Sequence, residues 1–433
     1  MKPSKIARLA SRACVLFLVL SLAGATSAGF AAQAVERSVR PALYSEAALA
    51  TADDPASVSP TERAATVSYA GEIAAVGGSG ADTLAPVAFD DAWFLSDDPS
   101  YNESLASTCA VLSAACNASS LHYTNGAKDY AVCALEELGF EDADSSSYRT
   151  RSTVADELAG IARGNTGVSA YVFARKTLHD AAGEDAGELV FVGVRGTYGG
   201  EWLSNFDLGT AGPHAGFDAA KRETALALER YLDAHRIDEA RCSFLVTGHS
   251  RGGAVANLLA ADLVNARDAS DRPASVRAYT FGAPLTTRDL ARSDERYDCI
   301  CNLENPSDIV CRVPFSAWGF GRYGITATLP DRAGSGCDEA VERMRGVRAA
   351  LTGYDIVGFE GAVVPADGLD DLDSSVESCA PSIAEAAQPS FLAAAAGFFM
   401  GVDVPRMAAA HCPDTYVAWT YAVDASRISF SRL

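Results

Sequence analysis

Short apolar runs and apolar residues at helical spacing follow one another along most of the chain. Helical spacing predicts helices over 101–118 and 128–139 and another that ends within 158–163. Apolar runs with β-branched or aromatic residues predict strands over 168–173, 189–194, 244–246, 276–281 and 299–303. Later, residues 338–352 place apolar side chains on one helical face, and 390–402 form a further apolar segment. Alternating strands and helices predict the α/β class.

The segment from 242 to 266 combines a strand, a tight turn and a helix. The turn, Gly248-His249-Ser250-Arg251-Gly252, matches the pattern G-x-S-x-G. Side chains at Gly248 and Gly252 would collide with the adjoining strand and helix, so glycine is required there. This turn predicts that Ser250 is a nucleophile raised above the sheet edge. The alternative is a glycine-rich turn with an ordinary surface serine, and His249 is interpreted as a packing or hydrogen-bonding residue of the turn.

A serine hydroxyl needs a histidine to remove its proton, and on this strand–turn–helix arrangement the partners follow in the order serine, acid, histidine. Among the six histidines, only His411 follows Ser250. The acid is expected just past the end of the strand 299–303, where Asp308 stands. Asp298 and Asp331 are the rival acids. Since Cys412-Pro413 follows His411, we expect this histidine to lie on a loop.

Four sequence blocks occur together and in a fixed order. They are FVGVRGTYGGEWLSNFD from residue 191, HAGF from 214, TGHSRGGAVANLLA from 247 and YTFGAP from 279. Together they resemble the class 3, or fungal-type, lipases of the α/β-hydrolase fold, over about 168–308 and again near His411. The resemblance implies a mostly parallel central sheet flanked by helices, with an N-terminal helical region and a helical insertion before His411.

The resemblance also implies site residues. The backbone N–H groups of Thr197 and Arg251 would form an oxyanion hole, and such donors stabilise the charge that develops on an ester carbonyl under attack. The family usually has leucine where Arg251 stands, so we expect a long cation at the mouth of the site. Arg195 is interpreted as a structural hydrogen-bonding or ion-pairing residue.

The function implied is that of a serine carboxylic-ester hydrolase, a lipase or esterase of lipid metabolism, with a Ser250–Asp308–His411 triad and an acyl-enzyme intermediate. The expected partner is an ester or lipid substrate, met at a membrane surface or lipid interface, and no metal or organic cofactor is expected. The net charge of −21 argues against a nucleic-acid partner. Alternatives are a thioesterase or peptidase on the same fold and a non-catalytic surface-binding module. The oligomeric state is left open.

The first 34 residues have the pattern of a secretory signal peptide, with four basic residues before an apolar stretch and small residues after it. An uncleaved membrane anchor is the alternative, and either implies a secreted or cell-surface protein. Residues 35–85 are poor in large apolar side chains and predict a disordered linker. The hydrolase domain is then expected over 86–433.

The segment between Asp308 and His411 is long for a simple connection and predicts an insertion over about 312–405. Its segment 338–402 is either a cap over the site or a packed part of the core. Ten of the 11 cysteines lie beyond the signal segment, which suits disulfides in an oxidising compartment. Cys311 follows Asp308 closely and Cys412 adjoins His411, so we hypothesise a disulfide between these two cysteines.

Overall fold

The computed structural model describes residues 39–41, 61–71, 83–96, 98–117, 129–149, 170–196, 212–270, 275–330, 337–356 and 409–432. The predicted signal segment 1–34, the helix ending within 158–163 and the apolar segment 390–402 lie outside these residues. Among the described helices, none combines the length and the apolar character needed to cross a membrane.

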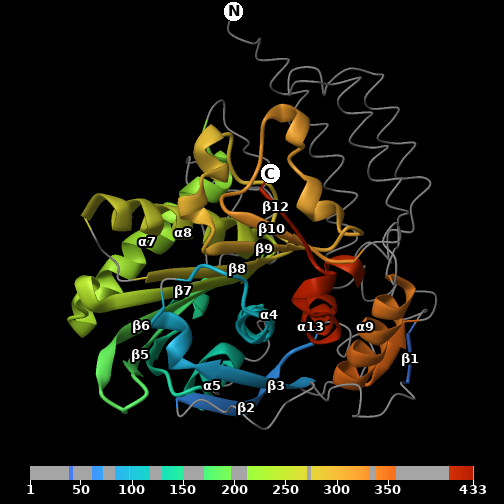
Figure 1. Ribbon diagram of the computed structural model, residues 1–433, viewed down its shortest axis with the longest axis horizontal. Coiled ribbons are helices and arrows are strands. Elements are labelled where there is room, and N and C mark those ends of the chain that lie inside the picture. Colours follow the sequence, from blue (N-terminus) through green and yellow to red (C-terminus); the bar gives the residue numbers. More distant parts are fainter. Residues whose placement is uncertain are drawn as a thin grey trace, which may run out of the picture.

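An eight-stranded sheet forms the centre of the molecule (Figure 1). In spatial order its strands are β12 (Ser429–Ser431), β10 (Ile325–Thr328), β9 (Ile300–Glu304), β8 (Ser275–Phe281), β7 (Cys242–His249), β6 (Asp185–Val194), β5 (Tyr171–His179) and β4 (Glu141–Asp144). Strands β6 to β10 are parallel, whereas β5 and the two edge strands, β4 and β12, run antiparallel to their neighbours. The predicted α/β class and mostly parallel sheet are confirmed.

Helices cover both faces of the sheet because its central strands are apolar on both sides. Along β6, Val190 and Val192 pack into one cluster with helices α7 (Ala215–His235) and α8 (Arg251–Ser270). Leu189 and Phe191 point the other way, into a cluster with α4 (Glu103–Cys116) and α5 (Tyr130–Glu137). Successive side chains of a strand point to opposite faces of the sheet, so neighbouring residues of β6 join different clusters. Helices α4 and α5 confirm the predictions over 101–118 and 128–139.

A two-stranded antiparallel sheet precedes α4 in the chain. Its strands, β2 (Glu62–Tyr69) and β3 (Thr83–Asp90), bury Val67, Tyr69 and Phe89 in the same cluster as α4. The predicted linker over 35–85 is therefore wrong for 62–69 and 83–85. These strands have few large side chains, but alternate residues pack under α4 and α5, and that packing stabilises them. Strand β1 (Val39–Pro41) also pairs, with β11 (Tyr354–Ile356).

Helix α9 (Cys337–Thr352) belongs to the core. Val341, Met344 and Val347 are buried in the cluster that also contains α13 (Pro413–Ala422), and the two helices pack against each other (Figure 1). For 338–352 the structure therefore matches the packed alternative and not the cap. The rest of the predicted insertion that lies outside the described residues stays a prediction.

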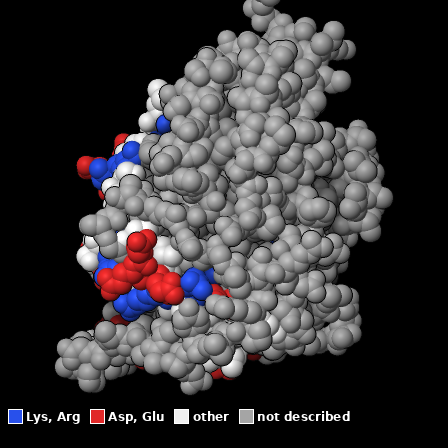
Figure 2. Space-filling model, turned by 90° about the vertical axis from the view of Figure 1, so that its right-hand side faces the viewer, with Lys and Arg blue, Asp and Glu red and all other residues white. Residues whose placement is uncertain are grey.

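Charged side chains of both signs meet on the side of the molecule that lies on the right in Figure 1. Among the residues coloured in Figure 2, acidic side chains gather next to basic ones. Exposed pairs of this kind include Arg345–Glu342 at 3.1 Å on α9 and Arg427–Glu339 at 3.5 Å. Such pairs contribute only about 0–1 kcal/mol each, so they offset charge locally and add little to stability.

Candidate active site

Ser250 lies in a strained turn between β7 and α8. Its φ of 58° is in the left-handed region, and its N–H donates to the carbonyl oxygen of Phe281 at 2.8 Å. A Cβ added to Gly252 would lie 2.2 Å from the Val194 carbonyl oxygen, and one added to Gly248 would lie 2.5 Å from the Gly252 backbone. The collision expected from the sequence is confirmed, because only glycine lets strand, turn and helix approach so closely.

The structure brings Ser250, His411 and Asp308 together. His411 Nε2 lies 2.9 Å from Ser250 Oγ, and His411 Nδ1 lies 2.7 Å from Asp308 Oδ2. All three side chains are buried. A carboxylate only accepts hydrogen bonds, so Nδ1 carries the proton and Nε2 presents its lone pair to the serine hydroxyl. The arrangement can therefore move a proton from Ser250 to His411.

The elements around these residues explain their placement. Asp308 follows β9 and accepts from the N–H of Val310 at 2.9 Å, which caps a short 3₁₀ turn. Residues 409–411 are helical and end immediately before the bend at Cys412 that precedes α13, so the loop predicted around His411 is only that bend. The rival Asp298 stands at the opposite end of β9 and pairs with Arg432 at 2.6 Å. Asp331 lies outside the described residues.

Asp308 is held ionised by its neighbours. Burial by itself would raise its pKa, but the charge of His411 and the hydrogen bonds from His411, Tyr416 and Val310 outweigh burial and lower the pKa. The Tyr416 hydroxyl, on α13, donates to Asp308 Oδ2 at 2.8 Å. The sequence indicates Tyr416 only as a tyrosine that follows His411, and its contact with the acid is visible only in the fold.

The hypothesised disulfide between Cys311 and Cys412 is wrong. Cys311 is a free, buried thiol, and its Sγ lies 3.6 Å from Asp308 Oδ2 and 3.4 Å from the Tyr416 hydroxyl. Burial, and then the charge of Asp308, raise the pKa of this thiol well above its ordinary value, so it stays protonated. The short turn after Asp308 directs Sγ toward the carboxylate and not toward a second sulfur.

Arg251 is the first residue of α8, and its side chain is buried with 1% of its surface exposed. The expectation of a cation at the mouth of the site is therefore wrong. Its backbone N–H stands at the N-terminus of a 20-residue helix, where the helix dipole favours negative charge. Arg195 is also buried, just past the end of β6, whereas Thr197 lies outside the described residues.

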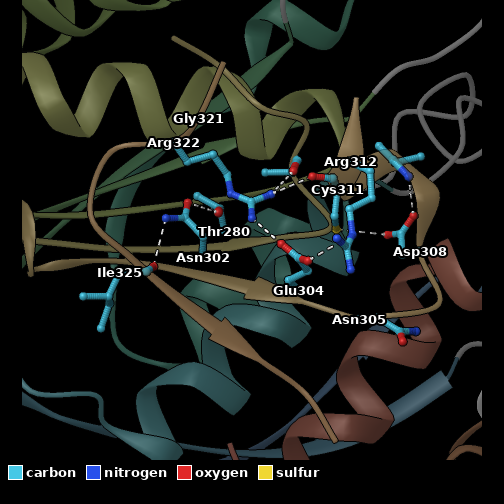
Figure 3. A network of polar contacts seen from close by, with 12 residues as sticks. Thr280, Asn302, Glu304, Asn305, Asp308, Cys311, Arg312, Gly321, Arg322 and Ile325 are labelled. Carbon is cyan, nitrogen blue, oxygen red and sulfur yellow. Dashed lines mark hydrogen bonds and ion pairs between the residues drawn. The ribbon is translucent and has the colours of Figure 1, made fainter. Parts of the chain in front are cut away.

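A buried ionic network anchors the turn that carries Asp308 (Figure 3). Arg322 donates from Nη2 to Glu304 at the end of β9, and from Nη1 to the carbonyl oxygens of Ala283 at 2.7 Å and Cys311 at 3.3 Å. Burial would lower the pKa of Arg322, but the charge of Glu304 outweighs burial and raises it. Asn305 adds a link from its Nδ2 to the carbonyl oxygen of Ala410, beside His411, at 3.0 Å. No sequence motif marks Arg322 or Glu304, so their part in the site is visible only in the fold.

Comparisons with known proteins find similarities to lipases. Residues 192–318 match the family described as Lipase (class 3). The secreted mono- and diacylglycerol lipase 1 of Fusarium solani is 32% identical over 134 residues, which is 29% of this chain and 36% of that protein. The chain thus matches about a third of that relative's length.

Solved structures of fungal lipases are also similar. The Rhizomucor miehei lipase in its propeptide complex is 20% identical, covers 53% of this chain and 68% of its own, and has a TM-score of 0.34. A fungal lipase in an inhibitor complex is 19% identical, covers 53% of this chain and 81% of its own, and has a TM-score of 0.37. The mostly parallel sheet flanked by helices defines an α/β-hydrolase. Over residues 192–318, the chain is similar in sequence to the class 3 lipases.

Proposed function

We propose that the protein is a serine ester hydrolase, a lipase or carboxylesterase. The observation that carries the proposal is the continuous chain of hydrogen bonds from Ser250 Oγ to His411 and on to Asp308, at 2.9 and 2.7 Å, on a turn strained by its positive φ. A strained turn that persists in a folded protein needs a reason, and presentation of a nucleophile is one.

The proposed reaction has two halves. In the first, His411 Nε2 takes the Ser250 proton while Oγ attacks the ester carbonyl carbon, and the protonated histidine then gives that proton to the leaving alcohol. In the second, His411 takes a proton from water while the water oxygen attacks the acyl carbon, and it then returns that proton to Ser250 Oγ as the bond from Oγ to the acyl carbon breaks and the carboxylic acid leaves. Asp308 fixes the tautomer of His411 and stabilises its cation without becoming protonated.

The charge on the tetrahedral intermediate needs hydrogen-bond donors. We assign these to the backbone N–H of Arg251, at the N-terminus of α8, and to that of Thr197. Loss of one such donor typically lowers the rate by about 100- to 1,000-fold.

The substrates we propose are acylglycerols or related esters, met at a lipid interface. The similarity to a mono- and diacylglycerol lipase supports this substrate class. The signal-like residues 1–34 and the secretion of that relative support export, with either a cleaved signal or a retained anchor. In this proposal, the hydrolase domain comprises the predicted 86–433 together with β2 and the start of β3, which pack in the same cluster as α4.

Labelling with a fluorophosphonate probe tests the proposal. We expect the purified protein to be labelled, and Ser250→Ala and His411→Ala each to abolish labelling, while Ser426→Ala, at an exposed position, is labelled like wild type. Equal labelling of Ser250→Ala would contradict the assignment of the nucleophile. Turnover of short- and long-chain esters, thioesters and peptides then separates a lipase or esterase from a thioesterase or peptidase.

A further inference from the structure

Asn117 and His249 link two parts of the site that are distant in the sequence. The N–H of Gly196, just past β6, donates to Asn117 Oδ1 at 2.7 Å. Asn117 Nδ2 lies 2.9 Å from His249 Nδ1, and His249 Nε2 lies 2.7 Å from the carbonyl oxygen of His411. The three contacts form an unbroken chain from the turn after β6 to the main chain of His411, which we call the Asn117–His249 relay.

The direction of each hydrogen bond follows from the chemistry of its ends. The His411 carbonyl only accepts, so His249 Nε2 carries a proton, and in a neutral imidazole Nδ1 is then an acceptor. Asn117 must therefore present its NH₂ to His249 and its oxygen to the N–H of Gly196. Flipping the amide would break both contacts, so every member of the relay is satisfied in one arrangement only.

The side chain of Asn117 is not needed to end its own helix. The main-chain N–H of Asn117 closes α4 by bonding to the carbonyl oxygens of Ser113 and Ala114. The approach to Gly196 is also close, since a Cβ added there would lie 3.1 Å from both Asn117 Oδ1 and the His249 carbonyl oxygen. The Asn117 amide is therefore available for its contacts with Gly196 and His249.

The charge state of His249 matters because its ring centroid lies 4.6 Å from that of His411. Burial, and then the charge of His411, lower the pKa of His249 to about 3, against a smaller opposing effect of Asp308. Tyr416 is the other titratable side chain whose ring contacts His249, at 5.8 Å between centroids. A cation at His249 would repel the imidazolium that forms on His411 during the proposed reaction.

We propose that Asn117 and His249 are positioning residues that hold the main chain of His411 and the turn at Gly196 in register with Ser250, and that the Asn117 amide bonds the neutral form of His249 through Nδ1. This inference rests on the proposed ester hydrolysis. It adds two residues that act through His411 and do not touch the reacting atoms.

Steady-state kinetics on a soluble p-nitrophenyl ester provide the first test. Asn117→Ala should lower kcat by about 10- to 100-fold with little change in KM, because small displacements of catalytic groups cost that much. The matched control is Asn102→Ala at the other end of α4, where the side chain only caps the helix by accepting from the N–H of Leu105. Its kcat should stay at the wild-type value. Wild-type kcat in Asn117→Ala would overturn the proposal.

A double-mutant cycle tests whether the two residues act as one unit. His249→Ala should lower kcat, His249→Gln should restore part of it by donating to the same carbonyl, and the double Asn117→Ala/His249→Ala variant should be within about twofold of the slower single variant. If the loss of kcat in the double variant equals the product of the two single losses, the two residues have independent structural roles and the proposal is overturned.

Histidine-ring NMR tests the neutral state without activity. In wild type the His249 ring should not titrate down to about pH 4. In Asn117→Asp, the new carboxylate can bond Nδ1 only when that nitrogen is protonated. This substitution should therefore raise the pKa of His249 toward or above about 6.5. Titration of wild-type His249 near its ordinary pKa would refute the proposed charge state. If wild type shows no Ser250-dependent turnover, the proposed function fails, while the NMR result still decides the state of His249.

Discussion

Breaking the buried ion pair beneath the Asp308 turn should destabilise the protein more than removing both of its charges. The Arg322 side chain is 1% exposed and that of Glu304 is 7% exposed. Glu304→Leu would leave the Arg322 guanidinium buried with only the two backbone carbonyl oxygens of Ala283 and Cys311 as partners. A buried charge without its counter-ion is costly, because burial keeps bulk solvent from replacing the lost interaction.

The size of the effect follows from the burial. Breaking a buried pair by removing one partner costs about 3–5 kcal/mol, a large share of the roughly 5–15 kcal/mol by which domains are stable. Arg312 is a second cation near Glu304, with its Nε 3.6 Å from Glu304 Oε1. Its side chain is 28% exposed, so this pair adds little to the free energy of unfolding. Glu304→Leu/Arg322→Met removes both buried charges and should recover most of the loss. It should still have a lower kcat, because the hydrogen bond from Arg322 to the Cys311 carbonyl oxygen is then lost.

Urea unfolding followed by tryptophan fluorescence measures these differences. Glu342→Leu is the control, since the Glu342 side chain is 60% exposed and the loss of its pair with Arg345 should change the free energy of unfolding by less than about 1 kcal/mol. The reasoning is refuted if Glu304→Leu costs no more than this control, or if the double variant is less stable than Glu304→Leu.

Three further predictions concern the turn and the site. Asp308→Asn should lower kcat for esters by about 10⁴-fold, because an amide favours the wrong tautomer of His411; a loss below about tenfold in a folded variant would contradict the proposed role. The pKa of His249 is lowered to about 3, chiefly by burial. Between about pH 6.5 and about pH 3 the unfolded state therefore binds a proton at His249 that the folded state does not. The contribution of neutral His249 to the free energy of unfolding should be complete above about pH 6.5, fall by up to about 1.4 kcal/mol per pH unit below that, and be lost near pH 3. Urea titrations of His249→Gln at several pH values should show a smaller fall of the free energy of unfolding between about pH 6.5 and about pH 3. The same fall in His249→Gln as in wild type would contradict this prediction. Gly252→Ala, whose methyl would lie 2.2 Å from a backbone oxygen, should lower Tm far more than Gly183→Ala, whose methyl meets nothing within 4 Å and carries only the strain of a φ of +80°; equal Tm values would refute the steric argument.

Local pattern was sufficient to predict the central part of the fold. The apolar run 244–246, the paired glycines and the following helix each depend on residues a few positions apart, so spacing alone predicts them. Chain order selected His411 and Asp308, which the fold places within hydrogen-bonding distance of Ser250 and of each other. The strands over 62–69 and 83–90 were missed because their few apolar side chains are stabilised by helices that follow later in the chain.

The tertiary structure alone decided which other side chains surround the site. Asn117 reaches His249 across 132 positions, and Tyr416 reaches Asp308 across 108. Arg251 is buried where its place in the motif indicated exposure, and the Cys311 thiol contacts a carboxylate where a disulfide was expected. Sequence spacing determines which face of an element a residue occupies, but contacts between distant elements depend on how the sheet and its helices pack. That packing sets the burial, partners and charge of the groups around Ser250.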